Sequence, residues 1–252
     1  MQGAAVEIVS RQNAVDPPHL KINSVVRNLE TLAKRAYKER WIIAYSSRTG
    51  LGKSIAVDYL AATLAIPHRI VRCKQTTSLR ALLASIALDE GERPRKSHRM
   101  QLNTSELYER AVERARQEPY LLGIDEADRL PKACFECVRD LWDDARLPIL
   151  LIGNEDLEPI INAGHERLAR RIRLRFNQAD LKAEVTREVL EFMGFVFTDE
   201  EAKTLWEACG GSPGWWEALL ANRNIIAELH GVKPAIEHLR GALKYFPTLT
   251  KK

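Results

Sequence analysis

The chain alternates short runs rich in apolar residues with longer stretches in which apolar residues recur every three or four positions. The runs are typical of buried β-strands and lie at residues 41–45, 69–73, 120–124, 148–152 and 172–176. The periodic stretches between them are typical of helices that bury one face. Strands that alternate with helices predict an α/β fold with a parallel sheet.

Local capping signals agree with this periodicity. Asn103 and Glu106 resemble a capping box, so a helix is expected from there to Pro119. The other helices expected in this part of the chain cover residues 24–36, 55–66 and 79–88 and the segment around Trp142. The polar and basic residues 89–103 are expected to form a loop.

The strand signal fades after about Asp180, and helix-start signals replace it. Thr198 and Glu201 form a second capping box, while Pro213 and Pro234 each suit the first turn of a helix. We therefore expect three parts: an irregular N-terminal segment (1–22), an α/β nucleotide-binding domain (23–178) and a small all-helical domain (179–252).

The first strand leads into a segment typical of a phosphate-binding loop, Ser47-Arg48-Thr49-Gly50-Leu51-Gly52-Lys53-Ser54. In such a strand–loop–helix unit, the backbone N–H groups of the loop and of the helix N-terminus surround the phosphates. Lys53 is expected to reach the β- and γ-phosphates, and Ser54 to bind Mg²⁺. Ser47 stands where the pattern G-x-x-x-x-G-K-[ST] has its first glycine, and a serine makes that turn less easily if φ is positive.

The strand at 120–124 ends in two adjacent carboxylates, Asp125 and Glu126. In a nucleotide site of this type, Asp125 is expected to hold Mg²⁺, directly or through water. Glu126 is expected to polarise the water that attacks the γ-phosphorus. The loop and the acidic strand together predict nucleotide hydrolysis or nucleotide-gated binding, with ATP and Mg²⁺ as cofactors.

Composition narrows the class of protein without identifying its partner. Of 252 residues, 45% are hydrophobic and 29% charged, as is usual for soluble globular proteins. No apolar run approaches the roughly 20 residues that span a bilayer, so no membrane partner and a cytoplasmic location are expected. A net charge of +4 permits nucleic-acid binding but favours it only weakly. Cys134 and Cys137 recur with apolar residues at helical spacing and are expected to be core residues rather than metal ligands.

A phosphate-loop α/β domain followed by helices resembles the AAA+ ATPases, in which the helical domain forms a lid. Gly153-Asn154 ends the strand at 148–152, so Asn154 matches the polar sensor residue that aligns the attacking water. It is expected to lie between the loop and the acidic strand. The segment 166–172 resembles the arginine-finger segment of this family. The resemblance implies that Arg171, with Arg170 as the reserve candidate, acts on the ATP of a neighbouring subunit.

Among AAA+ proteins, the chain is most similar to the target-selection ATPases of DNA transposition, the MuB, TnsC and TniB group. The matching pieces extend over roughly residues 24–245 and are Arg48-Thr49-Gly50, 124–130, 151–154, 168–172 and 212–214. The resemblance implies a homo-oligomer with ATP at its subunit interfaces, which forms helical filaments on duplex DNA without sequence preference. It further implies that the filament recruits a transposase and is cleared by hydrolysis.

Besides Ser47, one further stretch departs from the family's pattern. The lid usually supplies an arginine to the γ-phosphate just after its Pro-Gly turn, whereas Trp215-Trp216-Glu217 stands here and the next arginine is Arg223. Three alternatives follow: slow hydrolysis, a substitute role for Arg223, or a residue from a neighbouring subunit.

The candidates for DNA contacts are the basic residues before the helix that contains Glu106, namely Arg93, Arg95, Lys96 and Arg99. Cationic side chains on a loop neutralise phosphates and give affinity without sequence readout. Composition alone favours a solvated charged loop. The resemblance favours DNA, because the corresponding loop of related ATPases faces the DNA inside the filament.

Two other interpretations stay open. One is a helicase loader or replication initiator, which is also an AAA+ ATPase and acts on a replicative helicase. The other is an interaction module whose ATP site is degenerate. The intact Lys53, Asp125, Glu126 and Asn154 argue against the second.

Overall fold

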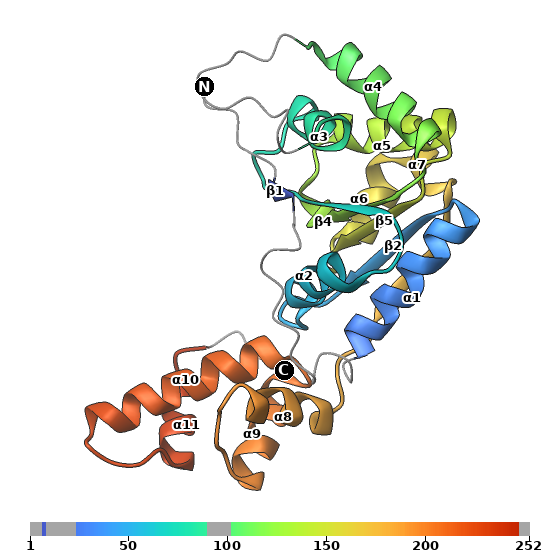
Figure 1. Ribbon diagram of the computed structural model, residues 1–252. Helices are drawn as coiled ribbons and strands as arrows, with labels where there is room; N and C mark the ends of the chain where they lie inside the picture. The colour runs from blue at the N-terminus through green and yellow to red at the C-terminus, as the bar shows by residue number, and fades with distance from the viewer. Residues whose placement is uncertain (1–6, 9–23, 90–101, 247–252) are drawn as a thin grey trace.

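A parallel sheet forms the centre of the protein. The computed structural model describes residues 7–8, 24–89 and 102–246 and has one six-stranded sheet, in the order β1-β3-β4-β5-β2-β6 (Figure 1). The five parallel strands are β2 (Ile42–Ser47), β3 (His68–Arg72), β4 (Leu121–Asp125), β5 (Ile149–Gly153) and β6 (Ile172–Gln178). The predicted α/β fold and its five strands are therefore confirmed.

Helices cover both faces of the sheet (Figure 1). Ile43 and Tyr45 of β2 belong to a core cluster with α1 (Ser24–Glu39) and α2 (Lys53–Thr63). Ile42 and Ala44, which alternate with them, belong to a second cluster on the other face. That cluster includes α3 (Leu79–Ala87), α4 (Thr104–Gln117), α5 (Lys132–Ala145), α6 (Leu157–Gly164) and α7 (Glu166–Ala169). Burial on both faces explains why the strands are continuous apolar runs.

Two predictions about local structure are confirmed within these layers. The Asn103 side chain accepts a hydrogen bond from the Glu106 N–H at 3.0 Å, and Glu106 accepts one from the Asn103 N–H at 2.6 Å. Cys134 and Cys137 are buried in α5 as free thiols. Among the described residues, no helix is both long and apolar enough to cross a membrane.

The N-terminal segment contains an element that the sequence did not predict. Glu7–Ile8 form β1, which pairs antiparallel with the edge of β3 through Glu7↔Arg72 and Ile8↔Val71. Two residues are too short to show an alternating pattern. The expectation of an irregular segment over 1–22 is therefore wrong at these two positions.

The C-terminal helices form the expected all-helical unit, here called the lid, which Figure 1 shows gathered beside one end of the sheet. It consists of α8 (Ala183–Phe192), α9 (Asp199–Cys209), α10 (Pro213–Leu229) and α11 (Ile236–Leu243). Trp216 lies in the middle of its apolar core and is fully buried. The predicted capping box of Thr198 and Glu201 is present at the start of α9.

Glu201 also takes part in a buried ion pair. One Glu201 carboxylate oxygen accepts a hydrogen bond from Arg223 of α10 at 2.8 Å, and the two side chains are only 3% and 4% exposed. Arg223 donates further to the carbonyl of Val196 at 2.9 Å. This pair joins α9 to α10 inside the lid.

Loss of this buried pair should destabilise the lid much more than loss of an exposed pair. Arg223→Met removes the charge that compensates buried Glu201, so we expect a loss of about 3–5 kcal/mol in the free energy of unfolding. The matched control is Arg240→Ala, which removes a pair with the neighbouring Glu200 in which both side chains are 62% exposed. There we expect at most about 1 kcal/mol. Chemical denaturation followed by tryptophan fluorescence compares the two variants, and equal effects would contradict the assigned role of the pair.

Candidate nucleotide-binding site

The phosphate-binding loop joins β2 to α2. Gly50 and Gly52 both have a φ of 86°, a left-handed conformation that glycine adopts without strain. Ser47 is the buried last residue of β2, and its φ is not positive. A glycine is therefore not needed at position 47. The Ser47 hydroxyl instead accepts a hydrogen bond from the Lys53 ammonium at 3.1 Å.

Lys53 is the charged centre of the loop. Its ammonium also donates to the carbonyl oxygens of Ser47 and Arg48, at 3.0 and 3.1 Å. Burial lowers the pKa of Lys53, while the carboxylates of Glu126, Asp128, Asp125 and Glu155 oppose that shift. Since these four carboxylates are close enough to influence the pKa of Lys53, the loop and the carboxylates form one electrostatic unit.

Asp125 lies buried at the end of β4, beside an arginine that the sequence did not single out. Its Oδ2 accepts a hydrogen bond from Arg72 Nε at 2.8 Å, and Arg72 also pairs with Asp58 of α2 at 2.8 Å. Burial raises the pKa of Asp125, and Arg72 and the backbone N–H of Glu126 oppose that shift. The strand register pairs Arg72 with Asp125, so the last residues of adjacent parallel strands meet here.

Glu126 follows directly in a left-handed conformation, with φ 56° and ψ 40°. For a residue other than glycine this conformation costs roughly 1–2 kcal/mol. Such strain is common at functional sites. The carboxylate forms an ion pair with Arg129 Nε at 3.0 Å. Burial raises the pKa of Glu126, and the charge of Arg129 is the largest opposing influence.

Asn154 lies at the end of β5, between β4 and the strand that carries the phosphate loop, as predicted. Its backbone N–H donates to Asp128 Oδ1 at 2.9 Å. A Cβ at Gly153 would lie 2.7 Å from the same oxygen, so glycine permits this approach. Asp128 therefore fixes the end of β5 against the turn after β4, an interaction that the sequence analysis missed.

The lid closes one side of the site. The Gly214 N–H at the start of α10 donates to the Gly50 carbonyl at 2.9 Å, and a Cβ at Gly214 would lie 3.1 Å from Gly50 Cα. Arg48 of the loop forms an ion pair with Asp180, which precedes α8, at 2.7 Å. These contacts fix the lid directly on the phosphate loop.

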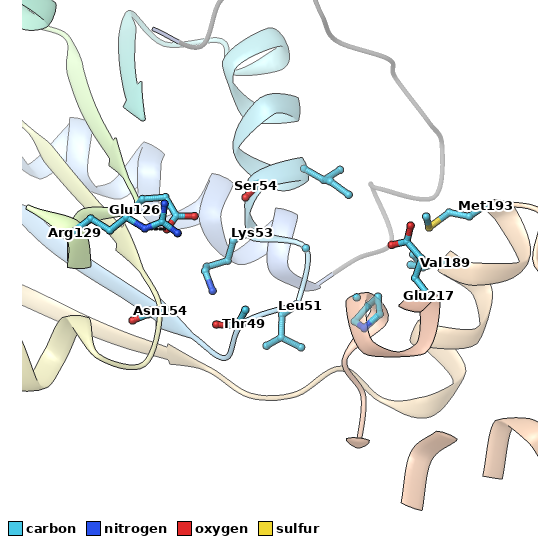
Figure 2. A pocket seen from close by; sticks show the side chains of 15 residues that line it. Thr49, Leu51, Lys53, Ser54, Glu126, Arg129, Asn154, Val189, Met193 and Glu217 are labelled. Atoms are coloured by element: carbon cyan, nitrogen blue, oxygen red, sulfur yellow. Dashed lines mark ion pairs between the residues drawn. The ribbon is translucent and has the colours of Figure 1, made fainter. Parts of the chain in front are cut away.

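Together these elements enclose a cavity of about 450 Å³, a size typical of small-molecule sites. Figure 2 shows Glu126, Arg129 and Asn154 at one end, Lys53, Ser54 and Thr49 in the middle, and Val189, Met193 and Glu217 of the lid at the other end. The cavity lining includes Thr49, Gly50, Leu51, Gly52, Lys53, Ser54, Glu126 and Asn154 from the predicted site.

The cavity also resolves part of the question about the missing lid arginine. Glu217 of α10 lines the cavity, whereas Trp216 lies in the lid core. Arg223 pairs with Glu201 inside the lid and does not line the cavity. The alternative in which Arg223 substitutes for the lid arginine is therefore wrong for this structure, because its guanidinium is needed in the lid core.

Arg170 and Arg171 lie away from the cavity of their own chain. The register pairs Ile172 with Ile42, at the opposite end of β2 from Ser47. A six-residue strand is roughly 20 Å long. Arg171 Nε donates to Asp143 at 2.7 Å and a further nitrogen donates to the carbonyl of Arg167 at 3.0 Å. Arg170 pairs with Glu166 and its side chain is 73% exposed. The DNA-contact candidates Arg93, Arg95, Lys96 and Arg99 lie outside the described residues.

Comparisons with known proteins agree with this geometry. The AAA domain family matches residues 37–161. The ORC1 protein of Aeropyrum pernix, solved in complex with DNA, superposes with a TM-score of 0.62 at 18% identity, over 88% of this chain and 64% of that one. Cdc6p from Pyrobaculum aerophilum superposes with a TM-score of 0.66 at 15% identity, over 96% and 72%. The matched residues include the phosphate loop, Asp125, Glu126 and Asn154, and the fold is that of an AAA-type domain.

One similarity in sequence is more specific. The Mu-like prophage FluMu DNA transposition protein B of Haemophilus influenzae is 29% identical over 175 residues, which cover 65% of this chain and 58% of the relative. In sequence the chain therefore resembles a MuB-type transposition protein, and the AAA domain match agrees with that resemblance. The chain spans less than two thirds of the length of that relative. The ORC2 protein of Aeropyrum pernix, solved as ADPNP–ADP complexes, superposes with a TM-score of 0.63 at 13% identity, over 96% of this chain and 72% of that one.

Proposed function

We propose that this protein assembles on duplex DNA in the presence of ATP, as a helical filament, and recruits or activates a transposase at the target site. The similarity to a DNA transposition protein B carries this proposal. The cavity between the phosphate loop and the lid also supports it. A lid that closes over ATP would make assembly depend on whether ATP or ADP is bound.

In the proposed reaction, the loop N–H groups and Lys53 bind the phosphates, and Glu126 takes a proton from the attacking water. Asn154, held by Asp128, orients that water. The Ser54 hydroxyl and the Asp125 carboxylate are hard oxygen donors that suit Mg²⁺. Each Asp125 oxygen accepts one hydrogen bond, from Arg72 or from the Glu126 N–H, and retains a further lone pair. Mg²⁺, when bound, supplies neutralisation of the phosphate charge.

Arg171 is proposed to complete the site of the next subunit. Its distance from its own cavity, along the length of β2, supports action on a neighbour rather than on its own chain. The bonds to Asp143 and the Arg167 carbonyl hold its guanidinium on the rigid start of β6. A fixed positive charge stabilises the γ-phosphate where charge spreads in the transition state.

The residues Arg93, Arg95, Lys96 and Arg99, in the connection between α3 and α4, are proposed to contact DNA phosphates. Replacing Arg95, Lys96 and Arg99 with alanine should weaken binding to unrelated duplexes about equally. Each lost phosphate contact should lower the slope of log K against log salt by roughly 0.9. Fluorescence anisotropy over a salt series measures that slope, and an unchanged slope in the folded triple variant would exclude these residues as DNA contacts.

A second candidate function is that of a helicase loader or replication initiator. The fold similarity to ORC1 and Cdc6p favours it, with TM-scores of 0.62 and 0.66. At 18% and 15% identity, this likeness concerns the fold alone. The similarity in sequence to a transposition protein therefore makes the first function the better supported.

Nucleotide-gated DNA binding tests the proposal. We expect a labelled duplex of arbitrary sequence to bind the protein with ATP and Mg²⁺, and to bind much more weakly with ADP. Lys53→Ala should lose the ATP-dependent part, because the phosphates lose their cation. Equal affinity with ATP, with ADP and without nucleotide would contradict the proposal.

A further inference from the structure

The charges that line the nucleotide cavity draw attention to Arg129. Among the described residues that line it, Lys53 and Arg129 are the only cationic ones, while Glu126 and Glu217 are acidic. A triphosphate concentrates negative charge, and arginine presents a planar fork that matches phosphate oxygens. The chain therefore has one arginine of its own where a γ-phosphate would need charge.

Arg129 has a fixed backbone and a side chain with freedom to move. It ends the short turn Ala127–Arg129, in which its N–H donates to the Glu126 carbonyl at 3.0 Å. Ala127 is fully buried, and Asp128 is bonded to Asn154. The Arg129 side chain, in contrast, is 47% exposed. A rigid base under a half-exposed side chain allows the guanidinium to change partner without a change in the fold.

The present partner of Arg129 is the proposed base. Figure 2 shows the Arg129 and Glu126 side chains next to each other at one end of the cavity, joined by the 3.0 Å ion pair. The ion pair is made through Nε, and the guanidinium carries four further N–H groups on its other two nitrogens. While Glu126 is held in this ion pair, its carboxylate is less available to accept a proton from water.

We propose that Arg129 exchanges partners during the ATPase cycle, leaving Glu126 to bind the γ-phosphate of ATP and thereby freeing Glu126 to activate water. This inference rests on the proposed function of Glu126 and Lys53 in the same cavity. It gives Arg129 two tasks: it distinguishes ATP from ADP, and it links the presence of the γ-phosphate to the release of the base. It also supplies in cis a charge that α10, with Glu217, does not offer.

The test compares the affinities for ATPγS and ADP, each with Mg²⁺, by titration calorimetry. Arg129→Gln should weaken ATPγS binding by about 10- to 100-fold, the effect of one charge-assisted hydrogen bond, and change ADP binding by less than about threefold. Arg129→Lys keeps the charge without the fork and should fall in between. Arg240→Ala, which removes an exposed ion-paired arginine that does not line the cavity, is the matched control and should change neither affinity.

A double-mutant cycle tests the exchange itself. Glu126→Gln weakens the competing partner, so ATPγS affinity should rise severalfold in the parent protein and stay unchanged in the Arg129→Gln background. Equal losses of ATPγS and ADP affinity in Arg129→Gln, or additive effects of the two substitutions, would overturn the exchange. Either outcome would overturn the exchange alone. The proposed nucleotide site would still stand if the parent protein binds ATPγS and Lys53→Ala does not. A parent protein that binds neither nucleotide would overturn both.

Discussion

Glu126→Gln is expected to bind ATP and DNA and to lose hydrolysis, so that the protein stays locked on DNA. The amide keeps the size of the side chain but does not accept a proton from water, and general-base catalysis contributes about 10²- to 10⁴-fold. Glu126 lines the cavity together with Lys53 and forms the ion pair with Arg129 there, where we propose that the γ-phosphate binds. Phosphate release in a steady-state assay and the dissociation rate from DNA measure the two effects.

Lys53→Ala is the comparison that separates chemistry from binding. The substitution removes the Lys53 ammonium, which contacts the phosphate loop, so the binding of ATP and the binding of DNA should fail together. If Glu126→Gln hydrolyses ATP within a few-fold of the parent, or leaves DNA as fast as the parent under ATP, Glu126 is not the base.

Arg171→Ala is expected to bind ATP as a single subunit and to lose DNA-stimulated hydrolysis and assembly. Arginine fingers contribute about 10³- to 10⁵-fold to hydrolysis in well-studied nucleotidases. Arg170→Ala is the matched variant one residue away. Since Arg170 pairs with exposed Glu166 on its own helix, we expect a smaller loss there. A larger loss in Arg170→Ala would transfer the assignment to Arg170.

Mixing two inactive variants tests whether Arg171 acts between subunits. Lys53→Ala lacks a working pocket but keeps its finger, whereas Arg171→Ala keeps its pocket. Mixed interfaces should therefore recover part of the turnover. Absence of recovery at every mixing ratio, with both variants folded and co-assembled, would contradict action in trans.

The sequence was sufficient for those features that local chemistry determines. The strands were predictable because each is buried on both faces, and the capping boxes at Asn103 and Thr198 because their partners lie three residues away. The phosphate loop and the end of β5 were also predictable, because each is marked by a short run of consecutive residues. Two-residue β1 and the helices α6, α7 and α8 were not predicted individually. The strand β1 depends on pairing with β3, from which it is distant in sequence.

Contacts between distant residues account for what the sequence did not reveal. Three charged residues could not be assigned a role from the sequence. In the fold, Arg72 pairs with Asp125, and Arg129 pairs with Glu126. Asp128 accepts a hydrogen bond from the backbone N–H of Asn154. Arg223 looked free for the nucleotide, but Glu201 holds it in the lid core. One of these contacts could have been predicted. Arg72 and Asp125 end neighbouring parallel strands, and the carboxyl ends of such strands lie side by side.

Electron microscopy of the protein with ATP, Mg²⁺ and long duplex DNA tests the central proposal most directly. The account predicts a continuous helical coat that requires ATP, persists in Glu126→Gln and is absent in Lys53→Ala and Arg171→Ala. Isolated particles or closed rings on DNA, without a continuous coat under any of these conditions, would contradict it.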